Sequence, residues 1–308
     1  MVLCSTALSA IAPRARTRDP HFMSQPTEPA STTGDVAGSI VVAVDGSDHA
    51  DRAVRWAAEQ AVLEHHRLVA VAVGGSSDTC SEDAVATVRK LHPDLAVRGA
   101  SVPGDPREVL IDLSTQAHLL VVGSRGRGTL RGMLLGSVST TVSAHAACPV
   151  VVCRPPTMDH TQPGVVVGAD ATLESLPVIE FAYRQASLRN LPLTVLHCFW
   201  DAAAAVAQYR EARGEKSTSP DLEDLRAALS ESVAGLAEKY PDVPVTISLK
   251  HGFGEQALSP RHGGWDLIVV GRHPMTSEGR VLTGSIATPI VERTHATVAV
   301  VPEEAPSA

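Results

Sequence analysis

From residue 39 onward, short apolar runs alternate with longer stretches in which apolar residues recur every three or four positions. The short runs are rich in valine, which is typical of strands that are buried on both faces of a parallel sheet. In the first part of the chain we predict strands at Ser39–Val44, Arg67–Val73, Asp94–Val102, His118–Gly123 and Pro149–Cys153.

Helical patterns occupy the stretches between these runs. The apolar face of the first predicted helix consists of Ala50, Val54, Ala57, Ala58 and Ala61. Another helix start is indicated at residues 105–108. Asp105 can cap the helix, Pro106 suits its first turn, and Glu108 lies where a capping box has its acid. A further helix is expected from about Ser137 to Ala147.

The second part of the chain repeats the first. Its predicted strands are Val165–Asp170, Leu191–Phe199, Val243–Gly252, Asp266–Gly271 and Thr297–Pro302. Gly123, Gly136 and Ser137 recur 148 positions later, whereas Asp45 recurs 125 positions later as Asp170. Several matches at a constant offset indicate a tandem duplication. The difference of 23 positions is an insertion, Asp201 to about Pro220, which we interpret as a cover for the second site or a partner surface.

Strands that alternate with helices predict an α/β fold with a mostly parallel, doubly wound sheet in each half. We place the first domain at residues 39–154 and the second at 164–302, joined by a proline-containing linker at 155–163. Residues 1–38 are rich in Pro, Ser, Thr and Ala and are predicted to be a disordered tail, with Met23 as an alternative start. Residues 303–308 form a short second tail.

Composition excludes several classes of function. The net charge of −8 is unsuited to nucleic acid or an anionic membrane surface, and no apolar run is long enough to cross a bilayer. The five cysteines include no C-x-x-C pair, so neither a disulfide framework nor a zinc site is predicted, and no metal ligands are assigned. This cysteine usage indicates a reducing compartment, the cytoplasm, with buried and inert thiols.

The stretch VVGSRGRGTLRGMLLGSVSTTV, residues 121–142, contains the main candidate for function. Gly123 and Gly126 are followed after nine residues by Gly136 and Ser137, which begin a predicted helix. Glycines allow a backbone to approach a ligand closely, and the free N–H groups of a helix start suit phosphate. The simpler interpretation is a glycine-rich turn with Ser137 as an ordinary helix cap.

Charged residues lie close to this loop in the expected fold. Arg125 and Arg127 can add positive charge beside a phosphate. Asp45 and Gly123 both end predicted strands, so they belong to the sheet edge at which α/β proteins bind ligands. Asp45 has an alternative role as the Asx-turn residue of DGS.

At these residues the chain resembles the universal stress protein family in its tandem form, from Ser39 to Pro302. The resemblance lies in VAVDGS after the first strand, the G-x2-G-x9-G-S loop after the fourth, and the closing CPVVV. It implies two tandem flavodoxin- or Rossmann-like α/β sandwich domains with five strands each, and ATP, with Mg²⁺, in the first domain. The residues that it implies as ligand contacts are Asp45 and the Val73 backbone for the adenosine end, and Gly123, Gly126, Arg127, Gly136, Ser137 and the amides of Val138 and Ser139 for the ribose and phosphates.

The second half departs from this pattern. Pro274 stands at the position of Gly126, and proline has no N–H to offer a phosphate. The turn after Asp170 reads ADAT and has lost its glycine. We therefore interpret the second half as a weakened or lost nucleotide site with a mainly structural role.

Three other functions are alternatives to ATP binding. An oxidoreductase is disfavoured because Gly126-x-Gly128-x-x-x-Gly132 follows the fourth strand and not the first. No sequence motif of a hydrolase or transferase is present, and we predict that His65 and His66, with Glu64, lie on a solvated helix face and that His145 and His295 lie at helix C-termini. A protein-interaction module without nucleotide is the third possibility.

Together with the glycine loop, the resemblance thus implies an ATP-binding sensor or regulator of the stress response that acts on an unknown protein partner. No catalytic residue is assigned, so an enzyme is not predicted, although slow ATP hydrolysis stays open. The resemblance also implies that the last strands, Pro149–Cys153 and Thr297–Val301, pair within the chain as a pseudo-dimer, with further homodimerisation as an option.

Overall fold

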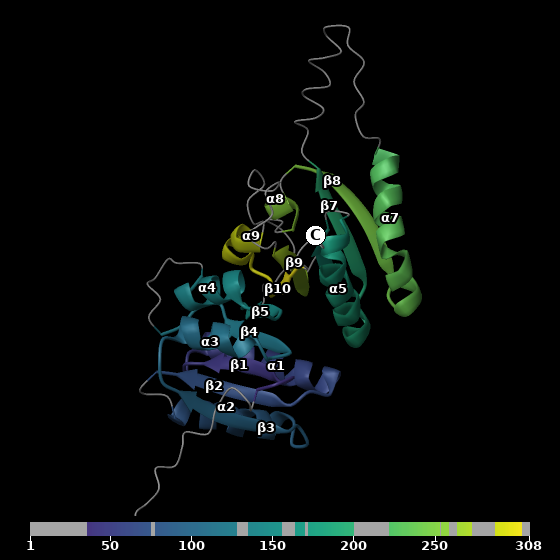
Figure 1. Ribbon diagram of the computed structural model, residues 1–308. Coiled ribbons are helices and arrows are strands. Elements are labelled where there is room, and N and C mark those ends of the chain that lie inside the picture. Colours follow the sequence, from purple (N-terminus) through teal and green to yellow (C-terminus); the bar gives the residue numbers. More distant parts are fainter. Residues whose placement is uncertain are drawn as a thin grey trace, which may run out of the picture. The chain divides into compact units, whose positions relative to one another are not determined.

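The computed structural model describes residues 36–74, 78–127, 135–155, 164–169, 172–199, 222–252, 254–258, 264–272 and 287–303 (Figure 1). The first half contains β1 (Ile40–Val44), α1 (Asp48–Glu64), β2 (Leu68–Val73), α2 (Asp78–Leu91), β3 (Val97–Val102), α3 (Pro106–Ser114), β4 (Leu119–Gly123), α4 (Ser137–His145) and β5 (Val150–Cys153). The second half contains β6 (Val165–Gly168), the short 3₁₀ helix η2 (Leu173–Ser175), α5 (Leu176–Arg189), β7 (Leu193–Phe199), α7 (Leu222–Lys239), β8 (Val245–His251), α8 (Gly254–Leu258), β9 (Leu267–Arg272), α9 (Ala287–Arg293) and β10 (Val298–Pro302). The predicted α/β alternation and its repetition are confirmed.

The strands form one sheet in the order β3-β2-β1-β4-β5-β10-β9-β6-β7-β8. Neighbours are parallel within each half, and β5 and β10 are antiparallel. In that central pair Val150 faces Val300, and Val152 faces Val298. The predicted pairing of the two closing strands within one chain is therefore confirmed.

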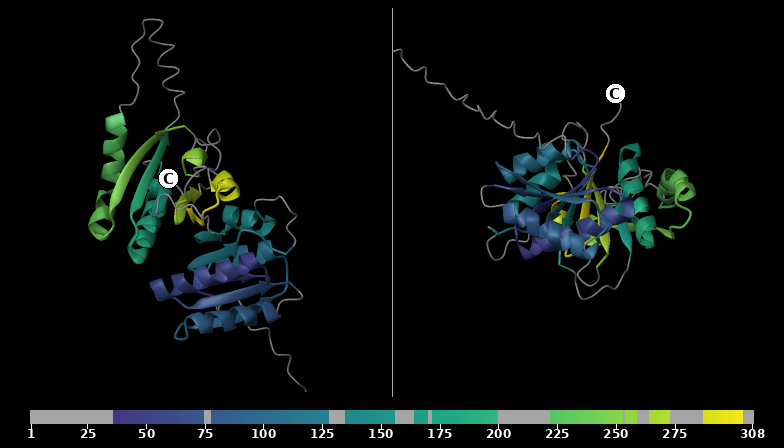
Figure 2. Two further views of the ribbon diagram at one scale, coloured as in Figure 1. Left: turned by 180° about the vertical axis from the view of Figure 1, so that it is seen from behind. Right: turned by 90° about the horizontal axis from the view of Figure 1, so that it is seen from below.

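Alternate residues of each strand enter two separate apolar layers, as the period of two in a strand requires. In β1, Ile40, Val42 and Val44 pack with α1 and α2 on one face, while Val41 faces the layer that includes residues of α3 and α4. The same division places α5 and α7 on one face of the second half and α8 and α9 on the other. Figure 2 shows these helices on both sides of the strands. Both faces of the sheet are covered, which explains the valine-rich strands.

Helix starts follow their sequence signals in α1 and α3. Ser47 caps α1 by accepting a hydrogen bond from Ala50 N, and the buried residues of α1 include the complete predicted apolar face. Asp105 caps α3 by accepting from Arg107 N at 2.8 Å, with Pro106 in the first turn as expected. These caps fix where each helix leaves the sheet edge.

Side chains from both halves meet on either side of the central strand pair. Arg154, after β5, donates to the carbonyls of Val291 and Glu292 at the end of α9. Arg272, at the end of β9, donates to the carbonyls of Ala144 and Ala146 at the end of α4. Each arginine thus satisfies backbone acceptors at a helix C-terminus of the other half, where positive charge is favoured.

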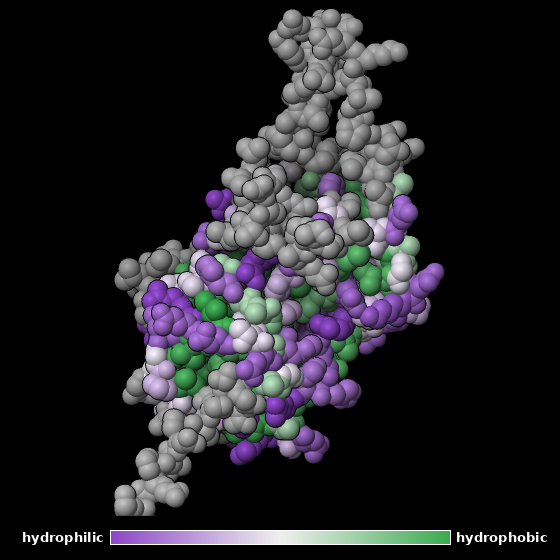
Figure 3. Space-filling view, viewed as in Figure 1, coloured by the Kyte–Doolittle hydropathy of each residue, from purple (hydrophilic) through white to green (hydrophobic). Residues whose placement is uncertain are grey.

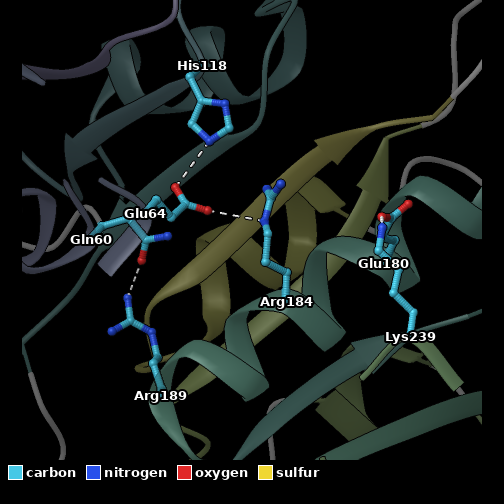
Figure 4. A network of polar contacts seen from close by, with 7 residues as sticks. All are labelled: Gln60, Glu64, His118, Glu180, Arg184, Arg189 and Lys239. Atoms are coloured by element: carbon cyan, nitrogen blue, oxygen red, sulfur yellow. Dashed lines mark hydrogen bonds and ion pairs between the residues drawn. The ribbon is translucent and has the colours of Figure 1, made fainter. Parts of the chain in front are cut away.

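A second group of contacts contradicts one prediction. Glu64 does not lie on a solvated face, because its side chain is 6 % exposed and lies between His118 and Arg184 (Figure 4). Arg184 belongs to α5, so this burial depends on the other half of the chain. His65 ends α1 in the left-handed conformation with φ 56°.

Smaller differences concern element ends and undescribed segments. The third strand begins at Val97 and not Asp94, β6 ends at Gly168, and the helix predicted to reach Ala147 ends at His145. His145 occupies the last turn of α4, and His295 follows α9. Most of the linker, the insertion, residues 1–35 and residues 304–308 lie outside the described residues, as do Asp170, Pro274, Gly284 and Ser285.

Candidate functional site

A pocket of about 410 Å³ opens where β1 and β4 end. In the sheet, β2 lies on one side of β1 and β4 lies on the other. The strand order therefore reverses between β1 and β4, at this edge. Ligands of open α/β sheets bind at such points. The volume falls within the range of about 300–1,000 Å³ that is common for small-molecule sites.

All nine residues predicted as ligand contacts line this single pocket. They come from the ends of β1, β2 and β4, from the loop after β4 and from the first turn of α4: Asp45, Val73, Gly123, Gly126, Arg127, Gly136, Ser137, Val138 and Ser139. These nine residues belong to segments that are up to 94 positions apart in the chain.

The apolar part of the pocket was missed by sequence reasoning. It includes Ala43 and Val71 from the strands and Pro106 and Leu110 from α3. Leu110 occupies an ordinary core position of an amphipathic helix, and its pattern does not distinguish a core neighbour from a pocket wall. The one available signal was the start of α3 directly after β3, at the ligand-binding edge.

The Asp45 carboxylate accepts hydrogen bonds from two separate segments, the β1–α1 turn and the glycine loop. Its Oδ1 accepts hydrogen bonds from Ser47 N at 3.0 Å and Ser47 Oγ at 2.7 Å, which is the Asx-turn arrangement. Its Oδ2 accepts from Arg127 N at 3.0 Å. Asp45 thus ties the β1–α1 turn to the glycine loop, so it shapes the pocket besides lining it.

The three glycines of the motif meet different surroundings. A Cβ at Gly123 would lie 2.7 Å from the backbone of His49, and one at Gly126 would lie 2.6 Å from Asp45 Oδ2. Close packing therefore explains both of these glycines. A Cβ at Gly136 would have only ordinary contacts, the nearest at 3.5 Å to Arg125 Cα, and its φ of −80° suits any residue. Among the described neighbours, packing gives no reason for glycine at 136.

The first turn of α4 presents backbone donors to the pocket. Its N-cap is Gly136, not Ser137, and no side chain caps it, which corrects one of the two roles predicted for Ser137. The Ser139 hydroxyl donates to Gly123 O at 2.6 Å and braces the loop. By contrast, α1 and α3 each have a side-chain cap. A helix start without a cap leaves N–H groups that bind an anion well.

Two arginines supply positive charge around these amides. Arg125 and Arg127 both line the pocket, and the Arg127 guanidinium donates to Cys80 Sγ at 3.4 Å. On the surface, hydrophobic residues (green) reach the exterior between polar ones on the left of the view, where β1 and β2 end (Figure 3). The pocket thus combines an apolar wall with a polar, cationic end, which suits an amphipathic anion.

The corresponding place in the second half differs. Its pocket has a volume of about 110 Å³ and is lined by Gly168, His197, Gly271 and Glu303, among others. The Glu303 carboxylate lies over Gly271, since a Cβ there would be 2.0 Å from Glu303 Oε1. A carboxylate at the counterpart of Gly123 would repel a phosphate.

The family comparison agrees with this duplicated architecture. The model of the universal stress protein family matches residues 38–154 and again residues 164–302. The chain belongs to the universal stress protein family. Two matches in succession make it a tandem member of that family, as its sequence predicted.

Individual relatives match along nearly their whole length. A universal stress protein of Mycolicibacterium smegmatis is 30 % identical over 289 residues, which cover 85 % of this chain and 96 % of that protein. A universal stress protein of Mycobacterium tuberculosis is 29 % identical over 299 residues, which cover 88 % of this chain and 99 % of that protein. The crystal structure of a functionally unknown protein of Pseudomonas aeruginosa has the same fold, with a TM-score of 0.61 at 15 % identity. The match covers 89 % of this chain and 95 % of that one. No described helix of this chain is long and apolar enough to cross a membrane.

Proposed function

We propose that the first half of this universal stress protein binds ATP, together with Mg²⁺, in the pocket at the ends of β1 and β4. The observation that carries the proposal is the start of α4, where uncapped amides meet a glycine that packing does not require. Phosphates would accept from the amides of Ser137, Val138 and Ser139, with Arg125 and Arg127 nearby.

The adenosine end would occupy the apolar part of the pocket. Val71, Val73 and Leu110 offer an apolar surface to a base, and the Val73 backbone ends its strand there. Asp45 would face the ribose while keeping its hydrogen bonds to Ser47 and Arg127 N. We propose no nucleotide for the second half, whose smaller pocket carries Glu303.

We further propose that nucleotide occupancy regulates a protein partner. α4 starts in the pocket and ends at carbonyls that Arg272 of the second half holds. A ligand that binds to the first turn of α4 would therefore act on a helix that both halves contact. As a nucleotide-dependent stress regulator the protein would work in the cytoplasm, where its buried free cysteines stay reduced.

Two substitutions at one position test the phosphate contact. Proline is tolerated in the first turn of a helix, and Gly136 before it has the extended conformation (ψ 151°) that proline prefers in its predecessor. Ser137→Pro therefore removes an N–H without breaking α4, whereas Ser137→Ala removes only the hydroxyl. We expect Ser137→Pro to weaken ATP–Mg²⁺ binding about tenfold, the loss of one hydrogen bond to a charged group, as measured by calorimetry.

The alanine variant serves as the control for the side chain and should lose less affinity. Equal affinities of the wild type and Ser137→Pro, with both folded, would refute phosphate binding at this helix start. A partner-binding module without nucleotide would then explain the pocket better.

A further inference from the structure

Three side chains with metal-binding atoms gather in the first half, away from the pocket. Glu64, His66 and His118 each offer one ligand atom, and these atoms lie within 4.8 Å of one another. Glu64 Oε2 is 3.1 Å from His118 Nε2, and the rings of His66 and His118 stack with centroids 4.1 Å apart. We propose that Glu64, His66 and His118 form a binding site for a divalent transition-metal ion of the Zn²⁺ type.

The backbone holds all three residues in place. Glu64 is the last residue of α1, and His65 ends that helix in the left-handed conformation. The chain then folds back, so that His66 N donates to Ala61 O at 3.0 Å. His118 N donates to Ser39 O at 2.9 Å, directly before β4. Ligands on fixed backbone need little reorganisation to bind an ion.

The ligand types suit zinc and its neighbours in the transition series. Imidazole nitrogen and carboxylate oxygen bind Zn²⁺ at about 2.0–2.2 Å, and three protein ligands leave a fourth position for water. Ligand atoms around one ion lie closer together than 4.8 Å, so the side chains must converge slightly. The stacked rings must also tilt toward the ion, and His66 and His118 are both partly exposed, which leaves them room.

Arg184 of the second half completes the surroundings of the site. Its Nε lies 3.2 Å from Glu64 Oε1, which leaves Oε2 for an ion, and Figure 4 shows the carboxylate between Arg184 and His118. Carboxylates that bind metals are commonly held by such an outer contact. The metal would replace the Glu64–His118 hydrogen bond, and the positive charge of Arg184 limits the affinity.

The site is separate from the proposed nucleotide pocket. His118 directly precedes β4, whereas Gly123, the last residue of β4, lines the pocket. A strand of this length separates the two by about 13–17 Å. Zinc binding therefore neither requires nor tests nucleotide binding, and either proposal can fail alone.

The test is calorimetric titration of the full chain with ZnCl₂ alone, without nucleotide, in a non-chelating buffer. We expect one ion bound at this site, with affinity at least about tenfold weaker in His66→Gln and in His118→Gln. The chain has 13 histidines, so His145→Gln, at the exposed end of α4, is the matched control and should bind as the wild type does. A Co²⁺ titration should give the absorption of a tetrahedral site in the wild type and not in the two variants.

Circular dichroism establishes that each variant is folded. If His118→Gln does not fold, His66→Gln decides alone, since its side chain makes fewer described contacts. Zinc binding that is equal in the wild type and the folded His66→Gln variant would place the ion elsewhere and overturn the proposal. Absence of zinc binding to the wild type would also overturn it.

Discussion

Single residues of the glycine motif have separate roles, although the sequence presents them as one pattern. Gly123 allows β4 to approach the backbone of His49 at the start of α1. Gly126 leaves space for the Asp45 carboxylate, and Gly136 begins α4 without a packing constraint from its described neighbours. The motif therefore combines two glycines that close packing explains with one, Gly136, that it does not.

Gly123→Ala should destabilise the protein by about 1–3 kcal/mol, because the new methyl group meets backbone atoms that cannot rotate away. Urea unfolding of the variant and the wild type measures this difference. Gly235→Ala is the matched control: it makes the same change at an exposed position of helix α7, where a Cβ has no neighbour within 4 Å. The control should be stabilised slightly, since alanine favours a helix. Equal stability of Gly123→Ala and the wild type would contradict the packing role.

Glu64 gives a prediction for pH dependence. Burial raises the pKa of its carboxyl, but the hydrogen bond with His118 and the charge of Arg184 outweigh this, so the pKa lies below its ordinary value of 4.5. A lowered carboxyl pKa means that the ionised form stabilises the fold above about pH 4.5, and that this stability is lost as the pH falls through the folded pKa.

Glu64→Gln should therefore cost about 1–3 kcal/mol at pH 7 and progressively less in more acidic solution, measured by urea unfolding at each pH. Glu180→Gln is the control, because the pair of Glu180 with Lys239 is largely exposed and should contribute much less to stability. A Glu64→Gln effect that stays constant down to pH 3 would rule out the ionised carboxylate as its source.

At the scale of elements, local sequence patterns account for the helices and strands but not for contacts between distant elements. Most elements could be predicted, because valine runs and apolar faces recur with the periods of strands and helices. The burial of Glu64 could not, since it depends on Arg184, which is 120 positions away in another element. A cap by Ser137, one of two roles that the sequence left open, is also wrong. Gly136 is the N-cap of α4, and the local sequence is compatible with either residue in that position.

Gly136→Ser should raise the stability of the free protein and weaken ATP binding. A serine at the N-cap accepts a hydrogen bond from the N–H two or three residues later and stabilises a helix start by roughly a few tenths of a kcal/mol over glycine. The backbone at 136 accommodates a side chain, because a Cβ there meets only ordinary contacts. The same serine oxygen would compete with phosphate for the amides of α4.

Thermal melting and ATP titration of this variant measure the two effects. A higher melting temperature together with lower affinity is the expected combination. Unchanged affinity in a variant that melts higher would show that these amides do not bind the nucleotide.

For the whole molecule, duplication gives two halves with different capacities. The constant offset between repeated glycines and the alternation of strands with helices predicted two α/β repeats. The family resemblance implied the pairing of their closing strands, which β5 and β10 show. The cross-contacts of Arg154 and Arg272 were not predictable, because they join strand ends to helix ends more than 120 positions apart. The difference between the halves is clearest in their pockets, of about 410 and 110 Å³.

The most direct test of the account is the calorimetric stoichiometry of ATP–Mg²⁺ on the full chain. We predict one nucleotide per chain, bound in the first half, because the pocket there presents the uncapped start of α4 beside Arg125 and Arg127, whereas Glu303 lines the smaller pocket that the described residues of the second half form. Two nucleotides per chain would mean that the second half binds despite Glu303. No binding at all would contradict the central claim and leave the glycine loop as a structural element.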